Sequence, residues 1–340
     1  MQRCIALAKK GLGTTYPNPL VGSIVVYNDT IIGEGWHYQA GEPHAEVRAI
    51  QAVRNKTLLK EATIYVSLEP CSHFGKTPPC VNLILEKQIK NVIIGSKDPN
   101  PKVSGNGIKR LKEAGCHVIF GILEEECIAL NKRFFTFHQK KRPYIILKWA
   151  QTQNGYIAPQ SKNEIKPVWI SNKFSRQLVH KWRADEQAIL VGTKTVLDDN
   201  PILTVRDWTG ENPLRCVLDK NLKISKNASV FNDEAPTLVF TEKETKKKPG
   251  ITFHTIDFSN TKNIAKQICD ILYKVDVQSV IIEGGRKTLQ TFIDENLWDE
   301  ARIFSGNSIF KIGIKAPEIS GKTVYSKTIF SDNLVVIKND

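Results

Sequence analysis

Two α/β domains in one chain are the fold class that the sequence predicts, and three observations predict it. The chain has 340 residues, whereas single hydrophobic cores stop growing at about 250–300 residues. In both halves, short apolar runs typical of strands alternate with segments of helical spacing. A basic, proline-terminated segment at 139–143 separates the two series. We therefore expect a boundary after residue 142 and domains at 1–142 and 143–340.

The first domain is predicted to begin with a short helix over 2–11, which ends at Gly11 and Gly13. A β-hairpin follows over 21–32, because β-branched runs flank the turn residues Asn28 and Asp29. The later elements alternate as in an α/β layer sandwich. They are helix 45–53, strand 62–68, helix 78–85, strand 92–95, helix 108–114, strand 117–121 and helix 124–137.

The second domain shows the same alternation from Tyr144 onward. Its apolar runs are rich in β-branched residues, and helical or loop segments separate them. The predicted strands are 144–149, 188–191, 216–218, 237–240, 279–282 and 334–337. A second α/β domain follows from this order.

The composition indicates which kinds of partner the protein binds and where in the cell it is located. A net charge of +13 favours anionic partners, which are nucleic acids or phosphorylated small molecules. The basic residues are scattered apart from the runs at 140–142 and 246–248, so no basic helix of a nucleic-acid binder is predicted. No apolar run approaches the ~18–20 residues of a membrane span, and the first residues do not form a signal peptide. We expect a cytoplasmic protein without membrane association.

Three ligand-type residues and one carboxylate lie at predicted element ends. His44 opens a helix with Glu46 two residues later, Cys71 follows a buried strand, and Cys80 begins the next helix. One imidazole and two thiolates are ligands that zinc prefers, and three protein ligands leave a position for water. A neighbouring carboxylate can then move protons between water, a ring nitrogen and a leaving amine. This is the ligand pattern of zinc deaminases.

Each part of this pattern also has a plainer interpretation. A lone His-x-Glu at a helix start can reflect only the helix dipole, and a lone cysteine is usually a small buried hydrophobe. The set together favours a metal centre with one Zn²⁺ per chain, although other thiophilic metals fit the same ligands. The remaining cysteines have no such company and are expected to be structural: Cys4, Cys116, Cys127, Cys216 and Cys269.

The spacing of the two cysteines carries a family resemblance. Eight residues, Ser-His-Phe-Gly-Lys-Thr-Pro-Pro, separate Cys71 from Cys80, where the general deaminase pattern has two. With Thr15-Tyr-Pro-Asn-Pro-Leu-Val-Gly22, Gly33-Glu-Gly-Trp-His37, His44-Ala-Glu46 and Asp98-Pro-Asn-Pro101, this loop resembles the deaminase half of the bifunctional riboflavin biosynthesis RibD family across residues 1–140. The resemblance implies a cytidine-deaminase-like α/β/α sandwich. It also implies hydrolytic removal of the 2-amino group of 2,5-diamino-6-ribosylamino-pyrimidinone 5′-phosphate.

The same resemblance implies which residues contact that substrate. They are Asn18, His37, His73, Lys76, Asp98 and Asn100. Turn chemistry alone is the alternative for Asn18 and for the segment 98–101, but turns at strand ends are also where functional sites collect. His73 and Lys76 lie within the ligand-bearing loop, where a cation would face the substrate phosphate.

A glycine pair in the second domain follows the apolar run at 279–282. Glu283-Gly284-Gly285 precedes a helix that rises from Lys287. Exposed backbone N–H groups at such a turn bind phosphate, and glycine lets a nucleotide approach closely. On its own, this turn is as compatible with a simple strand-to-helix connection.

The context of the glycine pair resembles the reductase half of the same family. The matching segments are Leu147–Gly155, Trp169–Ser171, Arg183–Ala184, Val191–Arg206 and Glu283–Gly285. The resemblance implies a dihydrofolate-reductase-like fold and NADPH-dependent reduction of a ribosyl side chain to ribityl. It implies an NADPH site at Ala150, Trp169, Thr195, Asp199, Gly285, Arg286, Lys287, Thr288, Leu289, Gln290 and Thr291. It implies substrate contacts at Lys148, Arg183, Leu203, Arg206 and Glu283.

Two segments depart from the reductase pattern. Asn154 stands where the family has an aspartate, and 158–168 is longer and more basic than the family pattern. Arg183 and Arg206 suit a phosphate because guanidinium pairs with it bidentately, whereas the alternative is an ordinary salt bridge. Lys148 and Asp199 are candidates to orient or protonate the sugar.

The leading hypothesis is a bifunctional enzyme acting on phosphorylated pyrimidine substrates, cytoplasmic and homo-oligomeric, that binds neither nucleic acid nor membrane. A nucleic-acid-editing deaminase is the rival, but it predicts Pro-Cys-x-x-Cys spacing and an aromatic RNA platform, which the sequence does not show. A third hypothesis leaves one half without activity, and this applies less to the deaminase half because it keeps its ligands and Glu46.

Overall fold

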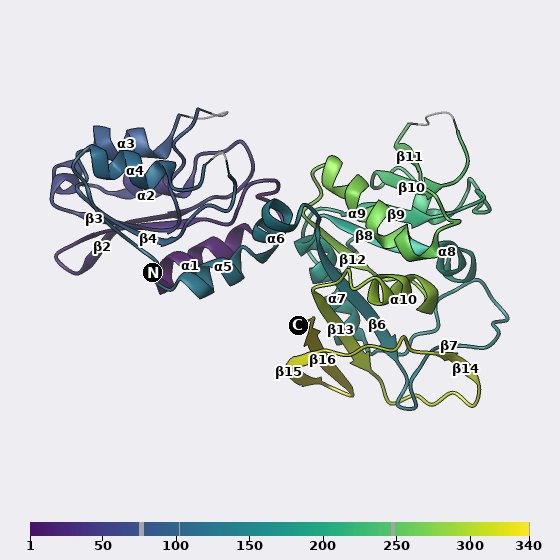
Figure 1. The fold of residues 1–340 in the computed structure, drawn as a ribbon. Coiled ribbons are helices and arrows are strands. Elements are labelled where there is room, and N and C mark those ends of the chain that lie inside the picture. Colours follow the sequence, from purple (N-terminus) through teal and green to yellow (C-terminus); the bar gives the residue numbers. More distant parts are fainter. Residues whose placement is uncertain (75–77, 102, 246–248, 340) are drawn as a thin grey trace. The chain divides into compact units, whose positions relative to one another are not determined.

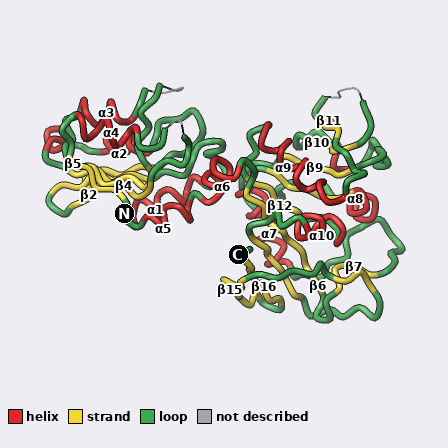
Figure 2. The backbone as a smooth tube through the Cα atoms, in the orientation of Figure 1, coloured by secondary structure: helices red, strands yellow, loops and turns green. Residues whose placement is uncertain are grey.

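The computed structural model describes residues 1–74, 78–101, 103–245 and 249–339. Its contacts divide the chain into two compact units, Met1–Lys141 and Arg142–Asp340. Each unit has its own sheet with helices beside it, so both are α/β as predicted (Figures 1 and 2). None of the described helices combines the length and the apolar character that a membrane crossing requires.

The first unit is built on a five-stranded sheet in the order β2-β1-β3-β4-β5. Strand β1 pairs antiparallel with β2 and with β3, whereas β3, β4 and β5 are parallel. The predicted turn residues Asn28 and Asp29 close the hairpin, both with positive φ, as a tight hairpin requires. The strands are β1 (Gly22–Tyr27), β2 (Thr30–Trp36), β3 (Thr63–Leu68), β4 (Asn91–Ser96) and β5 (His117–Phe120).

Helices cover both faces of this sheet because side chains alternate along its strands. Val25 packs in a cluster with helix residues such as Ile50 and Ile84, whereas its neighbour Ile24 packs with Leu7 on the other face. The sandwich therefore has three layers. Its helices are α1 (Gln2–Ala8), α2 (Ala45–Ala52), α3 (Cys80–Glu86), α4 (Asn106–Glu113), α5 (Glu124–Leu130) and α6 (Lys132–Lys140).

The prediction of one helix over Glu124–Phe137 is wrong. The structure has two helices there, α5 and α6, with Asn131 between them at φ −100° and ψ 24°. Asparagine is a weak helix former because its amide competes for hydrogen bonds. Here the amide bonds to Leu20, which lies 111 residues away in sequence, a partner that local periodicity does not reveal.

The second unit has a nine-stranded sheet in the order β11-β10-β9-β8-β12-β6-β13-β16-β15. The strands from β11 to β13 are mutually parallel, and β16 and β15 complete the sheet with antiparallel pairing. Strands β7 (Tyr156–Pro159) and β14 (Gly313–Lys315) pair separately. The others are β6 (Tyr144–Gln151), β8 (Ala188–Gly192), β9 (Leu214–Leu218), β10 (Thr237–Thr241), β11 (Ile251–Thr255), β12 (Ser279–Ile282), β13 (Glu300–Ser305), β15 (Lys322–Ile329) and β16 (Asp332–Lys338).

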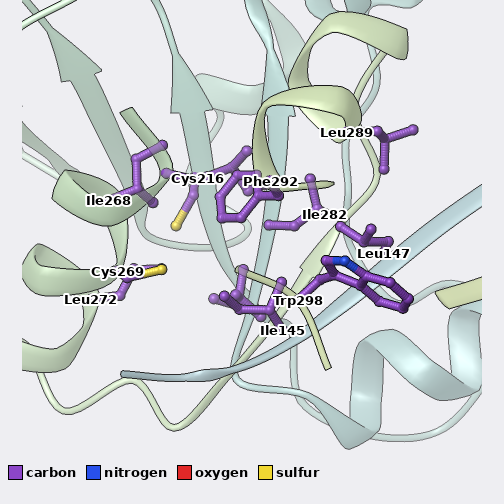
Figure 3. Close-up of a cluster of buried hydrophobic side chains, with 14 of the residues drawn as sticks. Ile145, Leu147, Cys216, Ile268, Cys269, Leu272, Ile282, Leu289, Phe292 and Trp298 are labelled. Carbon is purple, nitrogen blue, oxygen red and sulfur yellow. The ribbon is translucent and has the colours of Figure 1, made fainter. Parts of the chain in front are cut away.

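Two hydrophobic clusters hold helices against the two faces of this sheet. One joins Ile145 and Ile282 to Cys269 and Phe292, which lie on two helices of the same face (Figure 3). The other surrounds Ile146 on the opposite face. The helices are α7 (Lys173–Asp185), α8 (Thr193–Asp199), α9 (Ile264–Lys274) and α10 (Arg286–Asp294).

The six strands predicted in this unit are present, but the sequence analysis missed others. Strands β13 and β15 flank the predicted last strand, β16, on its two sides. Most of β15 is exposed, so it lacks the apolar alternation from which strands were predicted.

Candidate active sites

His44, Cys71 and Cys80 come together at one edge of the first sheet. His44 is the extended residue that caps α2, Cys71 follows the end of β3, and Cys80 begins α3. Their ligand atoms lie within 4.8 Å of one another. His44 Nδ1 is 3.5 Å from Cys71 Sγ and 3.3 Å from Cys80 Sγ. Tetrahedral zinc holds nitrogen and sulfur donors about 3.5 Å apart, so the donor set and its spacing fit this metal.

The local charges favour cation binding at this group. Hydrogen bonds from Cys80 and His44 lower the pKa of the Cys71 thiol to about 4, which favours the thiolate that metals require. Glu46 lies in the first turn of α2 and is 3% exposed. Burial raises the pKa of Glu46 to about 7. A carboxyl group with this pKa both accepts and releases a proton near neutral pH.

Asn18 and His37 also meet at this site. The Asn18 amide nitrogen lies 3.0 Å from His37 Nε2, and the two imidazoles of His37 and His44 pack edge to face with ring centroids 5.3 Å apart. His37 is 3% exposed, and burial lowers its pKa. His37 is therefore neutral at pH 7, suited to hydrogen bonding with a polar ligand rather than to pairing with its phosphate.

Glu69 is a residue that the sequence analysis missed. Its side chain is buried directly after β3, where its two carboxylate oxygens accept four backbone N–H groups. The donors are Asp98 at 3.3 Å, Gly105 at 2.9 Å, Gly107 at 2.8 Å and Ile108 at 3.2 Å. One side chain thus ties the strand end that leads to Cys71 to the 98–108 segment. An acidic residue between a buried strand and a predicted ligand was the available signal.

Asp98 and Asn100 follow β4, and the Asp98 backbone N–H is one of the four donors to Glu69. Asp98 is 9% exposed and accepts the Asn100 backbone N–H at 2.7 Å. Burial raises the pKa of Asp98 to about 6. The turn-chemistry interpretation of 98–101 therefore describes a real contact, and it coexists with a buried carboxyl group beside the metal-ligand loop.

The loop between the two cysteines is only partly described. His73 is exposed, and Lys76 lies outside the described residues. Arg110, on α4, holds the start of this loop by donating to the Ser72 carbonyl at 2.6 Å and to the Asn82 side chain at 2.7 Å. Sequence patterns gave no indication of Arg110. The five cysteines expected to be structural are all buried.

Glu283 is the centre of the polar cluster in the second unit. It follows β12 and forms ion pairs with Arg183 at 2.7 Å and with Lys148 at 3.2 Å. The Glu283 carboxyl is buried, but the positive charges of Arg183 and Lys148 lower its pKa to about 2. Three residues predicted to face one substrate are thus brought together from α7, β6 and the end of β12.

Arg206 lies beside this cluster. Its backbone N–H donates to His180 Nδ1 at 3.0 Å, and its guanidinium reaches the Thr204 hydroxyl at 3.4 Å. Arg183 also donates to the Thr204 carbonyl, at 3.3 Å. No carboxylate ion pair to Arg206 is present among the described residues, so its guanidinium remains suited to an anion.

The glycine pair lies against α8. The Gly285 backbone N–H donates to Thr195 Oγ1 at 3.0 Å, which joins two predicted cofactor residues. A Cβ on Gly284 would come within 2.8 Å of Thr288, so the tight turn into α10 excludes larger residues. A cavity of about 400 Å³ beside α8 is lined by charged residues of both signs, Lys194, Lys220, Lys223, Asp198 and Asp219.

The other predicted cofactor residues are spread over several environments. Trp169 is 60% exposed, with the Arg176 guanidinium 4.6 Å from its ring centroid. Leu289 is fully buried in the core of the sheet, and Leu203 is also buried. Arg286, Lys287, Gln290 and Thr291 lie on α10, and Ala150 lies on β6. Leu289 and Leu203 can therefore meet a ligand only through their backbones.

The two departures from the reductase pattern each have a structural partner. The Asn154 amide donates to the Phe310 carbonyl at 2.8 Å, a bond that an ionised aspartate cannot make. Lys162, in the long basic segment, forms an ion pair with Asp199. The amide of Asn154 and the amino group of Lys162 thus each bond to another residue of the second unit.

Comparisons with known proteins agree with both halves. A model of the cytidine and deoxycytidylate deaminase zinc-binding region matches residues 1–96, and a model of the RibD C-terminal domain matches residues 143–310. Riboflavin biosynthesis protein RibD of Aquifex aeolicus is 42% identical over 336 residues, covering 95% of this chain and 92% of that protein. RibD of Actinobacillus pleuropneumoniae is 41% identical over 84% of this chain and 77% of that protein.

Two solved structures are similar over nearly the full length of the chain. A diaminohydroxyphosphoribosylaminopyrimidine deaminase/5-amino-6-(5-phosphoribosylamino)uracil reductase from Thermotoga maritima is 41% identical, with a TM-score of 0.90. RibD of Acinetobacter baumannii is 31% identical, with a TM-score of 0.89. Each similarity covers 99% of this chain and 97% of the other chain. The predicted pair of fold types, deaminase-like and reductase-like, is confirmed.

Glu69→Gln is expected to destabilise the first unit by about 2–4 kcal/mol, because an amide nitrogen replaces one acceptor oxygen and leaves buried N–H groups unpaired. A urea titration that follows zinc release to a coloured chelator measures this change. Glu113→Gln makes the same substitution on the exposed face of α4 and is expected to leave the midpoint unchanged. Equal midpoints for the two variants would show that the four bonds to Glu69 contribute little.

Acid is expected to destabilise the second unit through His180. Burial, together with the charges of Arg183 and Arg206, lowers the pKa of His180 to about 4, against about 6.5 in an unfolded chain. As pH falls from 6.5 to 4, His180 therefore becomes protonated in the unfolded chain while it stays neutral in the folded chain. This effect lowers the free energy of unfolding by about 1–3 kcal/mol across that interval and vanishes above it.

Tryptophan fluorescence during urea unfolding at pH 7.5 and 4.5 measures this dependence, since five of the six tryptophans lie after residue 142. His180→Gln keeps a hydrogen-bond acceptor but does not titrate, so its difference between the two pH values should be smaller. An unchanged difference would assign the acid sensitivity to other groups.

Proposed function

The chain belongs to the RibD family of riboflavin biosynthesis proteins, and on this premise we propose which residues carry its two reactions. It is a bifunctional enzyme with a zinc-binding deaminase domain and an NADPH-dependent reductase domain. We assign the deaminase to residues 1–142 and the reductase to 143–340. The substrates are those named for the Thermotoga relative, a diamino-pyrimidine ribosylamino phosphate and its deaminated uracil product.

His44, Cys71 and Cys80 are the proposed zinc ligands. The observation that supports this half is the convergence of these three donors beside a buried glutamate. Zinc in such a site lowers the pKa of a bound water to about 7. A metal here would be held by electron pairs from the Cys71 and Cys80 thiolates and a neutral His44 imidazole.

Glu46 is the proposed proton carrier of the deamination. Its carboxylate accepts a proton from the attacking water and delivers it to the ring nitrogen next to the reacting carbon. It then takes the second proton from the hydroxyl group now on carbon and passes it to the amino group, which leaves as ammonia while the oxygen remains on carbon as a carbonyl. The raised pKa of Glu46 matches a group that must do both near neutral pH.

Six residues are proposed to hold the deaminase substrate. Asn18 and His37 present an amide and a neutral imidazole for the pyrimidine edge, and Asp98 and Asn100 offer polar groups from the loop after β4. His73 and Lys76 are assigned to the phosphate, in the loop between the zinc ligands.

The NADPH site is proposed along the turn between β12 and α10 and along α8. The Gly285 backbone and Thr195 are already in contact, and Asp199 ends α8. The remaining proposed contacts are Ala150, Trp169, Arg286, Lys287, Thr288, Leu289, Gln290 and Thr291.

The reductase substrate is proposed to bind at the Glu283 cluster. Arg183 and Arg206 suit its phosphate, Leu203 offers backbone groups, and Lys148 and Glu283 face the opened sugar. NADPH supplies the hydride to the sugar C1. The chain orients the two reactants, and Lys148 with Asp199 is assigned to orienting or protonating the sugar oxygen.

Small pyrimidine substrates follow from the family. A homo-oligomer, a cytoplasmic location, and the absence of nucleic-acid and membrane partners remain predictions. Gel filtration with light scattering and cell fractionation test the first two of them.

Both activities are tested together by mixing the purified chain with the diamino ribosylamino-pyrimidinone phosphate, with and without NADPH. We expect ammonia in both mixtures and NADPH oxidation only in the complete one. Ammonia without NADPH oxidation would contradict the reductase assignment and direct attention to Asn154. NADPH oxidation with added deaminated substrate, but no ammonia, would contradict the deaminase assignment.

Glu46→Gln is expected to lower ammonia release at least about 10²-fold, because the amide cannot carry a proton. Bound zinc, measured by atomic absorption, should remain near one per chain, and reduction of the deaminated substrate should be unchanged. Glu42→Gln is the matched control, since Glu42 is exposed and pairs only with Arg48 among the described contacts. Loss of zinc from Glu46→Gln would instead make Glu46 a ligand.

A further inference from the structure

We infer that Asn131 is a positioning residue of the deaminase site, which acts by holding the loop that carries Asn18. The inference rests on the proposed function, in which Asn18 contacts the pyrimidine. Asn131 lies between α5 and α6, and none of the roles proposed above includes it.

The Asn131 side chain bonds to both backbone polar groups of one loop residue, Leu20. Its Oδ1 accepts the Leu20 backbone N–H at 2.8 Å, and its Nδ2 donates to the Leu20 carbonyl at 2.9 Å. Asn131 is 3% exposed and Leu20 is 7% exposed, so water does not replace these bonds easily. Two antiparallel bonds fix both the position and the orientation of the Leu20 backbone, which a single bond does not.

Leu20 is two residues from Asn18, and the loop between them is short and stiff. Pro17 and Pro19 flank Asn18 and restrict its backbone. The Asn18 backbone N–H donates to the Thr15 carbonyl at 2.7 Å. A shift of the Leu20 backbone therefore moves the Asn18 amide relative to His37, from which it is 3.0 Å away.

The same displacement reaches His37 by a second route. Val21 follows Leu20, and its carbonyl accepts the His37 backbone N–H at 2.9 Å. The two bonds from Asn131 thus fix the backbone at Leu20, and the positions of both Asn18 and His37 depend on that backbone. This connection lies within the first unit throughout.

Helix formation does not explain why an asparagine stands at position 131. A leucine or alanine would continue the helix from 124 to 140 at lower cost. Asn131 instead lies at the break between the two helices. Its backbone N–H donates to the Ile128 carbonyl at 3.0 Å, and its side chain is free to bond to Leu20. Both capacities of the amide, donor and acceptor, are used by Leu20, and an ionised Asp or a Leu cannot provide that pair.

Asn131→Asp tests the inference, because it keeps the acceptor and places an oxygen against the Leu20 carbonyl. We expect the KM for the diamino-pyrimidine substrate to rise about tenfold while kcat falls less than about threefold, since substrate contacts are misplaced but the metal ligands and Glu46 are not. Zinc content and reduction of the deaminated substrate should equal those of the parent. Asn28→Asp, the same change at an exposed hairpin turn, should alter nothing.

A double-mutant cycle separates this inference from the role of Asn18. If Asn131 acts through Asn18 and His37, then Asn18→Ala should raise KM, and adding Asn131→Asp should raise it further by a smaller factor than Asn131→Asp does alone. An effect of Asn18→Ala with none of Asn131→Asp, or fully multiplicative effects, would overturn the inference and leave the contact by Asn18 intact. No effect of Asn18→Ala would overturn that contact and the inference with it.

Asn131→Gln covers the case in which Asn131→Asp does not fold. It keeps donor and acceptor but extends them by one methylene, so the Leu20 backbone must move, and the same rise in KM is expected. A parental KM in this variant, or a loss of zinc and kcat without a rise in KM, would show that Asn131 only stabilises the helix junction.

Discussion

The deaminase site depends on one buried carboxylate that gathers backbone donors. Where β3 ends, the chain must leave the sheet, turn and present Cys71, and backbone groups at such a turn cannot remain unpaired in the interior. Glu69 supplies two oxygens for four N–H groups of the 98–108 segment. Because the carboxylate is charged, these bonds are stronger than bonds between neutral groups. The loop with Asp98 and the strand end before Cys71 are therefore held at a fixed separation.

The reductase unit uses a glutamate at the corresponding point of its own sheet, with another result. Glu283 follows β12 directly, as Glu69 follows β3, but its partners are the side chains of Lys148 and Arg183. Side-chain cations can shift toward an anionic ligand, whereas backbone donors cannot. Glu69 thus holds backbone segments in place, whereas the side-chain partners of Glu283 can move. The net charge of +13 acts in the same direction, because it raises the local concentration of anionic substrates and cofactor.

The limits of sequence-based prediction follow from where the partners of each residue lie. Runs such as 62–68 and 279–282 identified their strands because burial on both faces leaves a continuous apolar pattern. The donors at His44, Cys71 and Cys80 could be found because soft ligands at element ends are rare by chance. Asn131 could not, since its partners are backbone groups distant in sequence, which carry no residue identity. For Glu69 the sequence offered only its place between a buried strand and a predicted ligand, and not its four backbone donors. Strand β15 was missed for a related reason, as an exposed edge strand has no apolar alternation.

The structural effect of a departure from the family pattern depends on the contacts that the new residue makes, and not only on its chemical class. The change to an amide at Asn154 removes a charge but adds a donor, and the structure uses that donor on the Phe310 carbonyl. The basic segment at 158–168 brings Lys162 to Asp199, which reduces the negative charge next to the region proposed for NADPH. A cofactor with several phosphate charges binds better beside a neutralised aspartate than beside a free one. Both departures thus make the local charge more positive, and the new groups are used in contacts within the chain.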